Sequence, residues 1–174
     1  NSIMLRAKLT IAGSNFIFSH INENYEEYLN KEKKLRVIFR GINVDYYNQK
    51  NISILKQEQL KKEWNLESNK FTILLPGRLT YWKGQEMFLE ALNKVNIQLG
   101  SNSFIAVILG NEQGRDLYKK KLIRLVEQYR LSNQVRFIDH CQNMPLAYKI
   151  SDIVISASTE PEAFGRVSVE AQSM

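Results

Sequence analysis

The chain has 174 residues, of which 44% are hydrophobic and 24% charged, so it can build one sizeable core. Its net charge of +6 suits phosphate-bearing ligands, nucleic acid or an anionic membrane surface. With a single cysteine and two histidines, the chain cannot form an internal disulfide, and a structural zinc site is disfavoured. No apolar run reaches the about 20 residues that a membrane span requires. We therefore expect a cytoplasmic protein.

Hydrophobic periodicity predicts strands and helices that alternate along the chain. The predicted strands lie at residues 8–12, 36–39, 70–75, 104–109, 134–138 and 151–156. The predicted helices cover residues 15–29, 54–64, 84–98, 116–130 and 144–149, and a last helix starts near 165. This alternation is typical of an α/β protein with a doubly wound, Rossmann-like parallel sheet.

Apolar residues at helical spacing predict which side of two of these helices faces the core. In the helix over 84–98 they are Met87, Phe88, Ala91, Leu92 and Val95. In the helix over 116–130 they are Leu117, Leu122, Leu125, Val126 and Tyr129.

Two carboxylates, Glu162 and Glu170, stand eight positions apart around the Phe164-Gly165 turn, between a predicted strand and a predicted helix. Eight helical residues rise about 12 Å, so the pair could bracket a nucleotide sugar, with the backbone amides that follow the turn facing the diphosphate. The same residues also fit a first-turn acid at Glu162 and a solvated or salt-bridged Glu170. The spacing alone leaves both interpretations open.

Two further strands are each followed by glycine. Gly77-Arg78 follows one strand and precedes Lys83-Gly84, and Gly110 follows the next strand. Because the carboxyl ends of parallel strands meet at one edge, these positions predict a crevice in which arginine and lysine hold a diphosphate. The alternatives are an ordinary ion pair for Arg78, a solvated Lys83 and a plain turn at Gly110.

Other candidate residues carry weaker signals. The run Lys119–Lys121 with Arg124 could contact nucleic acid, but on an amphipathic helix it is better explained as a solvated face. His140 and Cys141 follow a strand and could lie near a nucleobase, and His20 has no partners for a catalytic triad.

Taken in order, these segments resemble the retaining family 4 (group 1) glycosyltransferases of the GT-B fold over most of the chain. The residues that carry the resemblance are Arg40–Asp45, Gly77-Arg78 with Lys83-Gly84, Ile108–Gly110, Val135–Phe137, and Glu162–Gly165 through Glu170-Ala171. The resemblance implies transfer of a sugar from a nucleotide-diphosphate sugar to a glycan, lipid or other acceptor, as in cell-envelope polysaccharide biosynthesis. After Phe137 the family often has glycine where this chain has Ile138.

The resemblance also implies a role for each matching residue. Arg78 and Lys83 would stabilise the leaving diphosphate in place of a metal ion, and Glu162 would position the donor sugar. The family needs no protein nucleophile, and the acceptor attacks on the face that the leaving group vacates. No metal or cofactor is implied. The residues implied in donor binding are Gly77, Gly110, Phe164, Gly165, Arg166, Val167, Ser168 and Glu170, the last at the ribose.

By the same resemblance, residues 1–40 are the last strand, helix and strand of an N-terminal acceptor domain, and residues 41–174 are an incomplete donor domain. We expect these 174 residues to lack turnover, to bind donor weakly, and to pair the edge strand at 8–12 with a second copy. Nucleic acid is not an expected partner, whereas the inner membrane face is one if the acceptor is a lipid. The alternatives are a sugar-nucleotide 2-epimerase and a non-catalytic module that binds nucleotide sugars or proteins.

Overall fold

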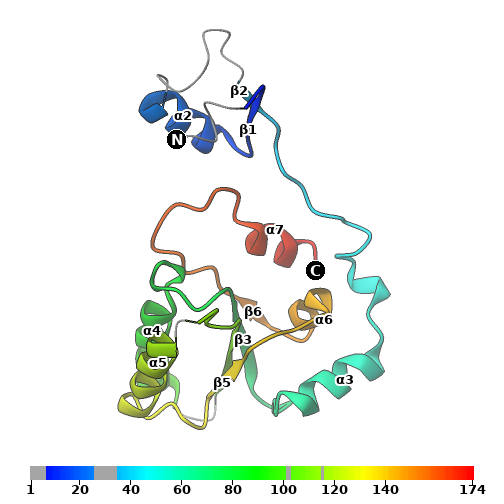
Figure 1. Ribbon diagram of the computed structural model, residues 1–174. Coiled ribbons are helices and arrows are strands. Elements are labelled where there is room, and N and C mark those ends of the chain that lie inside the picture. Colours follow the sequence, from blue (N-terminus) through cyan, green and yellow to red (C-terminus); the bar gives the residue numbers. More distant parts are fainter. Residues whose placement is uncertain (1–6, 26–34, 101–102, 115) are drawn as a thin grey trace. The chain divides into compact units, whose positions relative to one another are not determined.

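A computed structural model describes residues 7–25, 35–100, 103–114 and 116–174 (Figure 1). The chain divides into two compact units, Asn1–Ile42 with Pro161–Arg166, and Asn43–Glu160 with Val167–Met174. Each unit contains a parallel sheet, one with two strands and one with four. The parallel sheets and alternating helices confirm the predicted α/β fold class.

The first unit is built from one strand–helix–strand crossover. Strand β1 (Thr10–Ala12) pairs in parallel with β2 (Leu35–Val37), and helix α2 (Asn15–Tyr25) connects them. Ser14 caps this helix, because its Oγ accepts a hydrogen bond from the Ile17 amide at 3.3 Å. The helix predicted over residues 15–29 is confirmed as far as residue 25, and the rest of that prediction lies outside the described residues.

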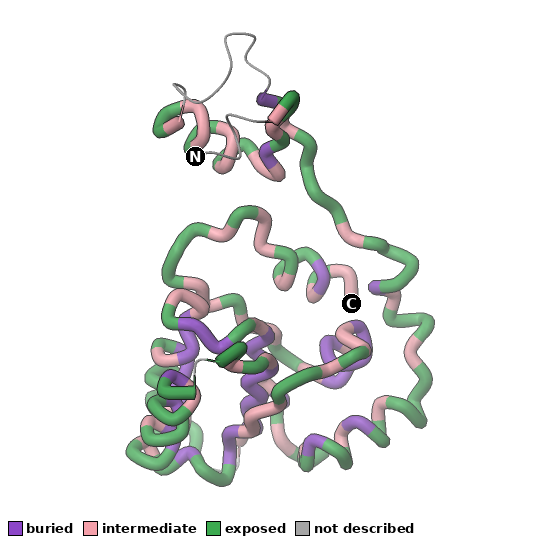
Figure 2. The backbone as a smooth tube through the Cα atoms, in the orientation of Figure 1, coloured by how far each residue is buried: buried purple, intermediate pink, exposed green. Residues whose placement is uncertain are grey.

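The second unit contains a four-stranded sheet in the order β5-β4-β3-β6, with every pairing parallel. Strand β4 is central and buried at every position, as expected for an uninterrupted aliphatic run covered on both faces (Figure 2). The strands are β3 (Phe71–Pro76), β4 (Phe104–Leu109), β5 (Val135–Ile138) and β6 (Ile153–Val154).

Helices cover both faces of this sheet, with α4 and α5 on one side and α3 and α6 on the other (Figure 1). The helices are α3 (Ile54–Glu63), α4 (Gln85–Leu99), α5 (Asp116–Gln128), α6 (Met144–Lys149) and α7 (Arg166–Gln172). Two 3-10 turns, η2 (Gln49–Asn51) and η3 (Tyr81–Lys83), precede α3 and α4. The core lies mainly between β3, β4, α4 and α5.

The predicted inward faces of α4 and α5 were partly wrong. Met87 and Ala91 are exposed, whereas Leu89 is fully buried, so α4 is rotated relative to the predicted face. On α5, Leu117 is 81% exposed and its neighbour Tyr118 is 1% exposed. Adjacent helical residues point about 100° apart, and at this place on α5 the larger aromatic ring, not the leucine, faces the core.

Among the described residues, no helix combines the length and the apolar character needed to cross a membrane.

Gly84 fixes the start of α4 against the segment after β6. Its φ is 72°, and a Cβ there would lie 1.8 Å from the Ala157 carbonyl oxygen. We expect Gly84→Ala to lower the free energy of unfolding by about 3–5 kcal/mol, from backbone strain and steric overlap together. Urea denaturation measures this loss.

Gly114→Ala is the matched control, because Gly114 also has a positive φ (82°) but has open space where a Cβ would be. It should cost only the strain, about 1–2 kcal/mol. Equal losses in the two variants would contradict close packing at Gly84.

Candidate functional site

The carboxyl ends of three neighbouring strands are joined by backbone hydrogen bonds. The Gly77 amide donates to the Leu109 carbonyl at 2.8 Å, and the Gly110 amide donates to the Ile138 carbonyl at 2.8 Å. A Cβ on Gly110, whose φ is 147°, would lie 2.2 Å from the Gly77 carbonyl oxygen. Glycine at 110 therefore lets the chain after β4 pass directly against the chain after β3.

The segment from Gly77 to Gly84, which we call the cationic loop, follows β3 and leads into α4. The Leu79 amide bonds the Asn111 carbonyl at 3.0 Å, and the Thr159 amide bonds the Trp82 carbonyl at 2.8 Å. The loop is thus anchored to the segments that follow both β4 and β6. The Thr80 hydroxyl is buried, and no partner for it lies among the described residues.

The two predicted cations of this loop lie at the same edge of the sheet. Arg78 is exposed, whereas Lys83 is half-buried and its Cδ lies 3.5 Å from the position of a Cβ on Gly77. The Lys83 ammonium lies 4.4 Å from the centre of the Trp82 ring, within the range of a cation–π contact. The structure therefore brings Gly77, Arg78, Lys83 and Gly110 together at one edge of the sheet.

Tyr118 lies beneath the cationic loop and is almost fully buried. Its ring centre is 4.3 Å from that of Tyr81, and its hydroxyl donates to Gln85 Oε1 at 3.3 Å. Burial, reinforced by the negative charge of Glu86, raises the pKa of Tyr118 well above its usual value. The phenol is therefore neutral and a hydrogen-bond donor at any physiological pH.

Glu170 is a buried carboxylate on α7, with 5% of its surface exposed. The Tyr148 hydroxyl donates to Glu170 Oε2 at 2.8 Å, and the Tyr148 ring centre lies 6.2 Å from that of Tyr47. Farther along, the Ser173 hydroxyl donates to the Tyr47 carbonyl at 2.7 Å. The second unit therefore holds Glu170 in place, and a solvated side chain is excluded at this position.

The other half of the two-carboxylate motif belongs to the first unit. There the Ser14 hydroxyl donates to the Ala163 carbonyl at 3.0 Å, and Gly165 has a φ of 72° just before α7. Glu162 lies in this unit and Glu170 in the second, so bracketing of one ligand by both carboxylates stays a prediction. Of the other predicted donor-binding residues, Phe164 and Arg166 fall in the first unit, and Val167 and Ser168 in the second.

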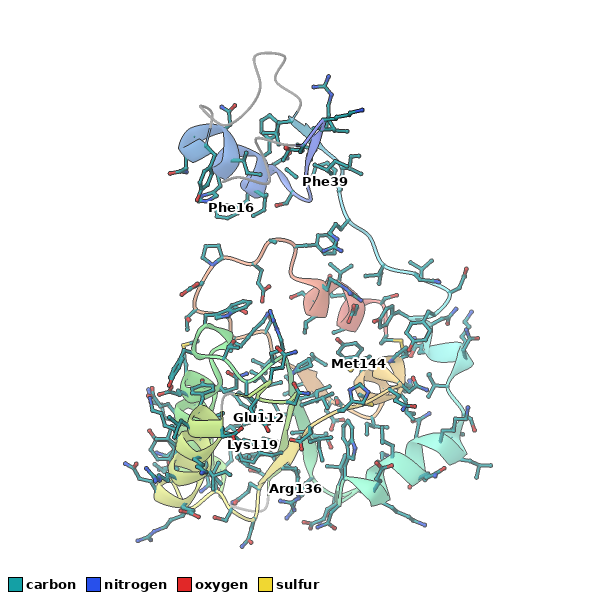
Figure 3. The ribbon with its side chains drawn as sticks, viewed as in Figure 1. Phe16, Phe39, Glu112, Lys119, Arg136 and Met144 are labelled. Carbon is teal, nitrogen blue, oxygen red and sulfur yellow. The ribbon has the colours of Figure 1, made fainter. Side chains whose placement is uncertain are left out.

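Two lysines of the run on α5 are paired with carboxylates. Lys119 Nζ lies 2.6 Å from Asp139 and 3.3 Å from Glu112, residues that follow β5 and β4 (Figure 3). The hydrogen bond to Asp139 raises the pKa of Lys119, and Lys121 forms an ion pair with Glu86. Lys119 therefore joins two strand-end loops, and two of the four cations of this run are paired with carboxylates.

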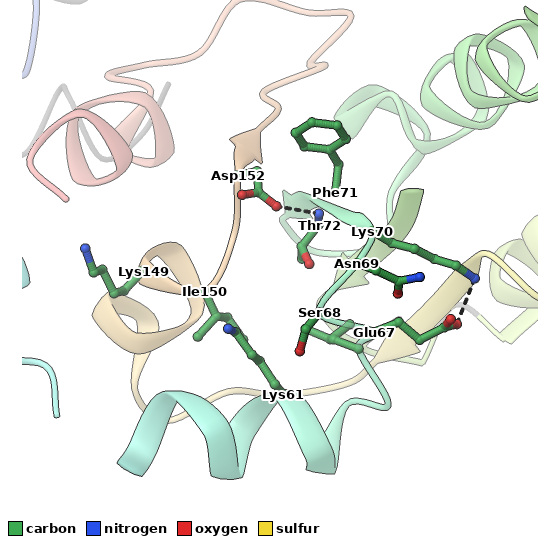
Figure 4. A pocket seen from close by; sticks show the side chains of 11 residues that line it. Lys61, Glu67, Ser68, Asn69, Lys70, Phe71, Thr72, Lys149, Ile150 and Asp152 are labelled. Atoms are coloured by element: carbon green, nitrogen blue, oxygen red, sulfur yellow. Dashed lines mark hydrogen bonds and ion pairs between the residues drawn. The ribbon is translucent and has the colours of Figure 1, made fainter. Parts of the chain in front are cut away.

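A cavity of about 330 Å³ lies at the opposite edge of the sheet, where β3 and β6 begin (Figure 4). Its charged groups are used locally. Lys70 pairs with Glu67 at 2.8 Å, and Asp152 accepts the Thr72 amide at 2.7 Å. Ligands of open parallel sheets bind at the carboxyl ends of the strands, so this cavity is not the predicted crevice.

His140 and Cys141 border another cavity of about 370 Å³, whose floor is formed by apolar Leu60, Trp64 and Leu146. Burial raises the pKa of the Cys141 thiol, so this cysteine is a poor nucleophile. Within the described residues, no group of three or more histidine, cysteine, aspartate or glutamate side chains is placed to hold a metal ion.

Sequence reasoning missed Gln85 and Tyr148, which hydrogen-bond the predicted site residues Arg78 and Glu170. It also missed Tyr118, which hydrogen-bonds Gln85. No local pattern distinguishes a buried glutamine at a helix start from the exposed glutamine that is usual there. The two tyrosines sit on amphipathic helices, where an aromatic residue ordinarily serves the core.

Comparison with known proteins identifies relatives over most of the chain. The model of a family described as glycosyl transferases, group 1, matches residues 56–174. An uncharacterized glycosyltransferase of Methanocaldococcus jannaschii is 30% identical over 144 residues, which cover 82% of this chain and 35% of that protein. The chain thus spans little more than a third of the length of this relative.

Two solved structures resemble the whole chain. A glycosyltransferase from Rickettsia africae is 36% identical, with a TM-score of 0.86, over 100% of this chain and 44% of that one. HepE from Anabaena, solved in complex with UDP-glucose, is 27% identical, with a TM-score of 0.81, over 99% of this chain and 44% of that one.

The Tyr148–Glu170 hydrogen bond should contribute measurably to stability. We expect Tyr148→Phe to lower the free energy of unfolding by about 1.5–3 kcal/mol, because it removes a donor to a buried carboxylate. Tyr46→Phe, at a neighbouring tyrosine that is 49% exposed, should cost less than about 0.5 kcal/mol. A loss as small as the control value in Tyr148→Phe would contradict the bond.

Tyr118 should make the protein sensitive to alkali. Its pKa is raised in the folded state, so above the ordinary tyrosine pKa of about 10 the unfolded chain loses this proton first, and stability falls with rising pH. The contribution of one such group is at most about 1.4 kcal/mol per pH unit. We expect Tyr118→Phe to flatten the fall between about pH 10 and 11.5 in urea titrations. An unchanged slope in Tyr118→Phe would argue against a buried phenol.

Proposed function

This chain belongs to the group 1 glycosyltransferases and has the Rossmann-like α/β fold of GT-B enzymes, and we propose that its second unit binds the nucleotide diphosphate of a sugar donor. The observation that carries the proposal is the cationic loop, which places Arg78 and Lys83 at the carboxyl edge of the sheet beside Gly77 and Gly110. Such an edge is the usual ligand site of an open parallel sheet.

A nucleotide-diphosphate sugar suits this edge chemically. Arginine can hold two oxygens of one phosphate, and a lysine adds a movable charge, so together they can neutralise a diphosphate. HepE, a relative at 27% identity, was solved with UDP-glucose, which supports this class of donor for the present chain. Uracil is therefore the first base to test.

The carboxylates would hold the two sugars. Tyr148 fixes one oxygen of Glu170, and a carboxylate accepts several hydrogen bonds, so this residue can still take a ribose hydroxyl. Glu162, with the Phe164-Gly165 backbone, would position the transferred sugar, and the amides of Arg166, Val167 and Ser168 would face the phosphates.

We propose a retaining transfer that needs no metal. The bond from the anomeric carbon to the diphosphate oxygen breaks, and a bond to the acceptor oxygen forms on the same face of the sugar. The proton of the acceptor hydroxyl passes to the departing diphosphate. Arg78 and Lys83 stabilise the charge that develops on the departing diphosphate. The acceptor would be a glycan, lipid or other hydroxyl compound, reached in the cytoplasm or at the inner membrane face. None of the relatives described above is named as an epimerase, and no observation favours that alternative.

Donor binding tests the proposal. Ligand-observed NMR with UDP, GDP and ADP sugars measures the affinity for each donor class, including weak ones. We expect binding of one donor class, weakened about 10- to 100-fold by Arg78→Ala and by Glu170→Ala, since each removes charged hydrogen bonds worth about 1.5–3 kcal/mol.

Arg124→Ala is the matched control, because Arg124 is an exposed arginine on α5 outside the cationic loop. It should leave the affinity within about twofold. Absence of binding to every donor, or binding indifferent to both site substitutions, would overturn the donor-site assignment.

A further inference from the structure

We propose that Gln85 and Tyr118 are positioning residues that hold the cationic loop in the shape in which it receives a diphosphate. This inference rests on the proposed function and extends it to two residues that lie outside the predicted contact set. Gln85 is the first residue of α4, and both side chains are almost fully buried.

Gln85 ties the loop to the helix that follows it. Its side-chain Nε2 donates to the Arg78 carbonyl oxygen at 2.8 Å, and its Oε1 accepts the Tyr118 hydroxyl at 3.3 Å. The amide thus uses both of its ends in an environment with no exposure to solvent. Since buried polar groups are costly to leave unpaired, the three groups favour one arrangement.

The tie acts on the residues that carry the loop's charge. Arg78 is held through its own carbonyl group, and Lys83 lies two positions before Gln85 in the chain. Lys83 also lies against Gly77, at the start of the same loop. The positions of both cations are therefore fixed relative to the first turn of α4. Loss of the hydrogen bond to the Arg78 carbonyl would free the backbone that orients the guanidinium.

Gln85 and Tyr118 together form what we call the brace. Its position predicts which part of a ligand it affects. Gln85 and Tyr118 are buried beneath the loop, so they would contact neither base nor sugar. Their effect should pass only through Arg78 and Lys83, and so through the phosphates. Loss of the brace should then weaken binding of a nucleoside diphosphate and leave binding of the bare nucleoside unchanged.

The test compares UDP with uridine by ligand-observed NMR, in the wild-type chain and in Gln85→Met, which keeps the side-chain length and removes both hydrogen bonds. We expect the dissociation constant for UDP to rise about tenfold and that for uridine to stay within about twofold. A role in folding alone would change both ligands equally or neither.

The matched control is Gln134→Met. Gln134 is 2% exposed and donates to Asn96 Oδ1 at 3.1 Å, but it precedes β5 at the opposite edge of the sheet. This variant removes another buried, hydrogen-bonded glutamine, but one outside the cationic loop, so it should keep the wild-type preference for UDP over uridine. A preference lost equally in both variants would overturn the proposal.

Tyr118→Phe keeps the test decisive if Gln85→Met does not fold, because it leaves the bond from Gln85 to Arg78 intact. It should weaken the binding of UDP about two- to fourfold and leave the binding of uridine unchanged. Suppose that the wild-type chain binds UDP more tightly than uridine, and that Tyr118→Phe and any folded Gln85→Met show the same preference. The brace proposal is then wrong and the donor site stands. A wild-type chain without any preference for UDP overturns the donor site and, with it, the brace.

Discussion

The close approach of two glycines at neighbouring strand ends is the constraint on which the candidate site depends. The Gly77 carbonyl occupies the place where any side chain on residue 110 would begin. That approach keeps the chain after β4 against the chain after β3, where the Leu79 amide bonds the Asn111 carbonyl. Without it, the cationic loop would have no wall beside it, and Arg78 and Lys83 would project from an ordinary surface turn.

Around this contact, backbone hydrogen bonds hold most of the segments in place, and side chains supply the adjustable contacts. Carbonyl groups of Leu109, Asn111 and Trp82 hold the loop through amide hydrogen bonds. Buried side chains add direction, as Tyr148 does for Glu170. Lys119 then links the loops after β4 and β5 through two carboxylates. The edge of the sheet is thus organised before any ligand arrives, which lowers the ordering cost of binding.

Much of this could be predicted from the sequence, for identifiable physical reasons. The short, uninterrupted apolar run of β4, rich in β-branched residues, favours a buried strand, and glycine after it marks a close approach. The orientation of α5 could not be predicted, because Leu117 and Tyr118 are both apolar enough to face the core and only packing chooses between them. The tyrosine partners of Glu170 and Gln85 lie 22 and 33 positions away, at separations that no local pattern encodes.

The three-membered chain of groups beneath the cationic loop also constrains how the sequence can change over time. A phenylalanine at position 118 removes one donor and leaves Gln85 bound to the Arg78 carbonyl, so this substitution is tolerable as a first step. An apolar residue at position 85 would strand a buried hydroxyl and a buried carbonyl together. Substitutions at these two positions therefore have a preferred order, with residue 118 changing before residue 85.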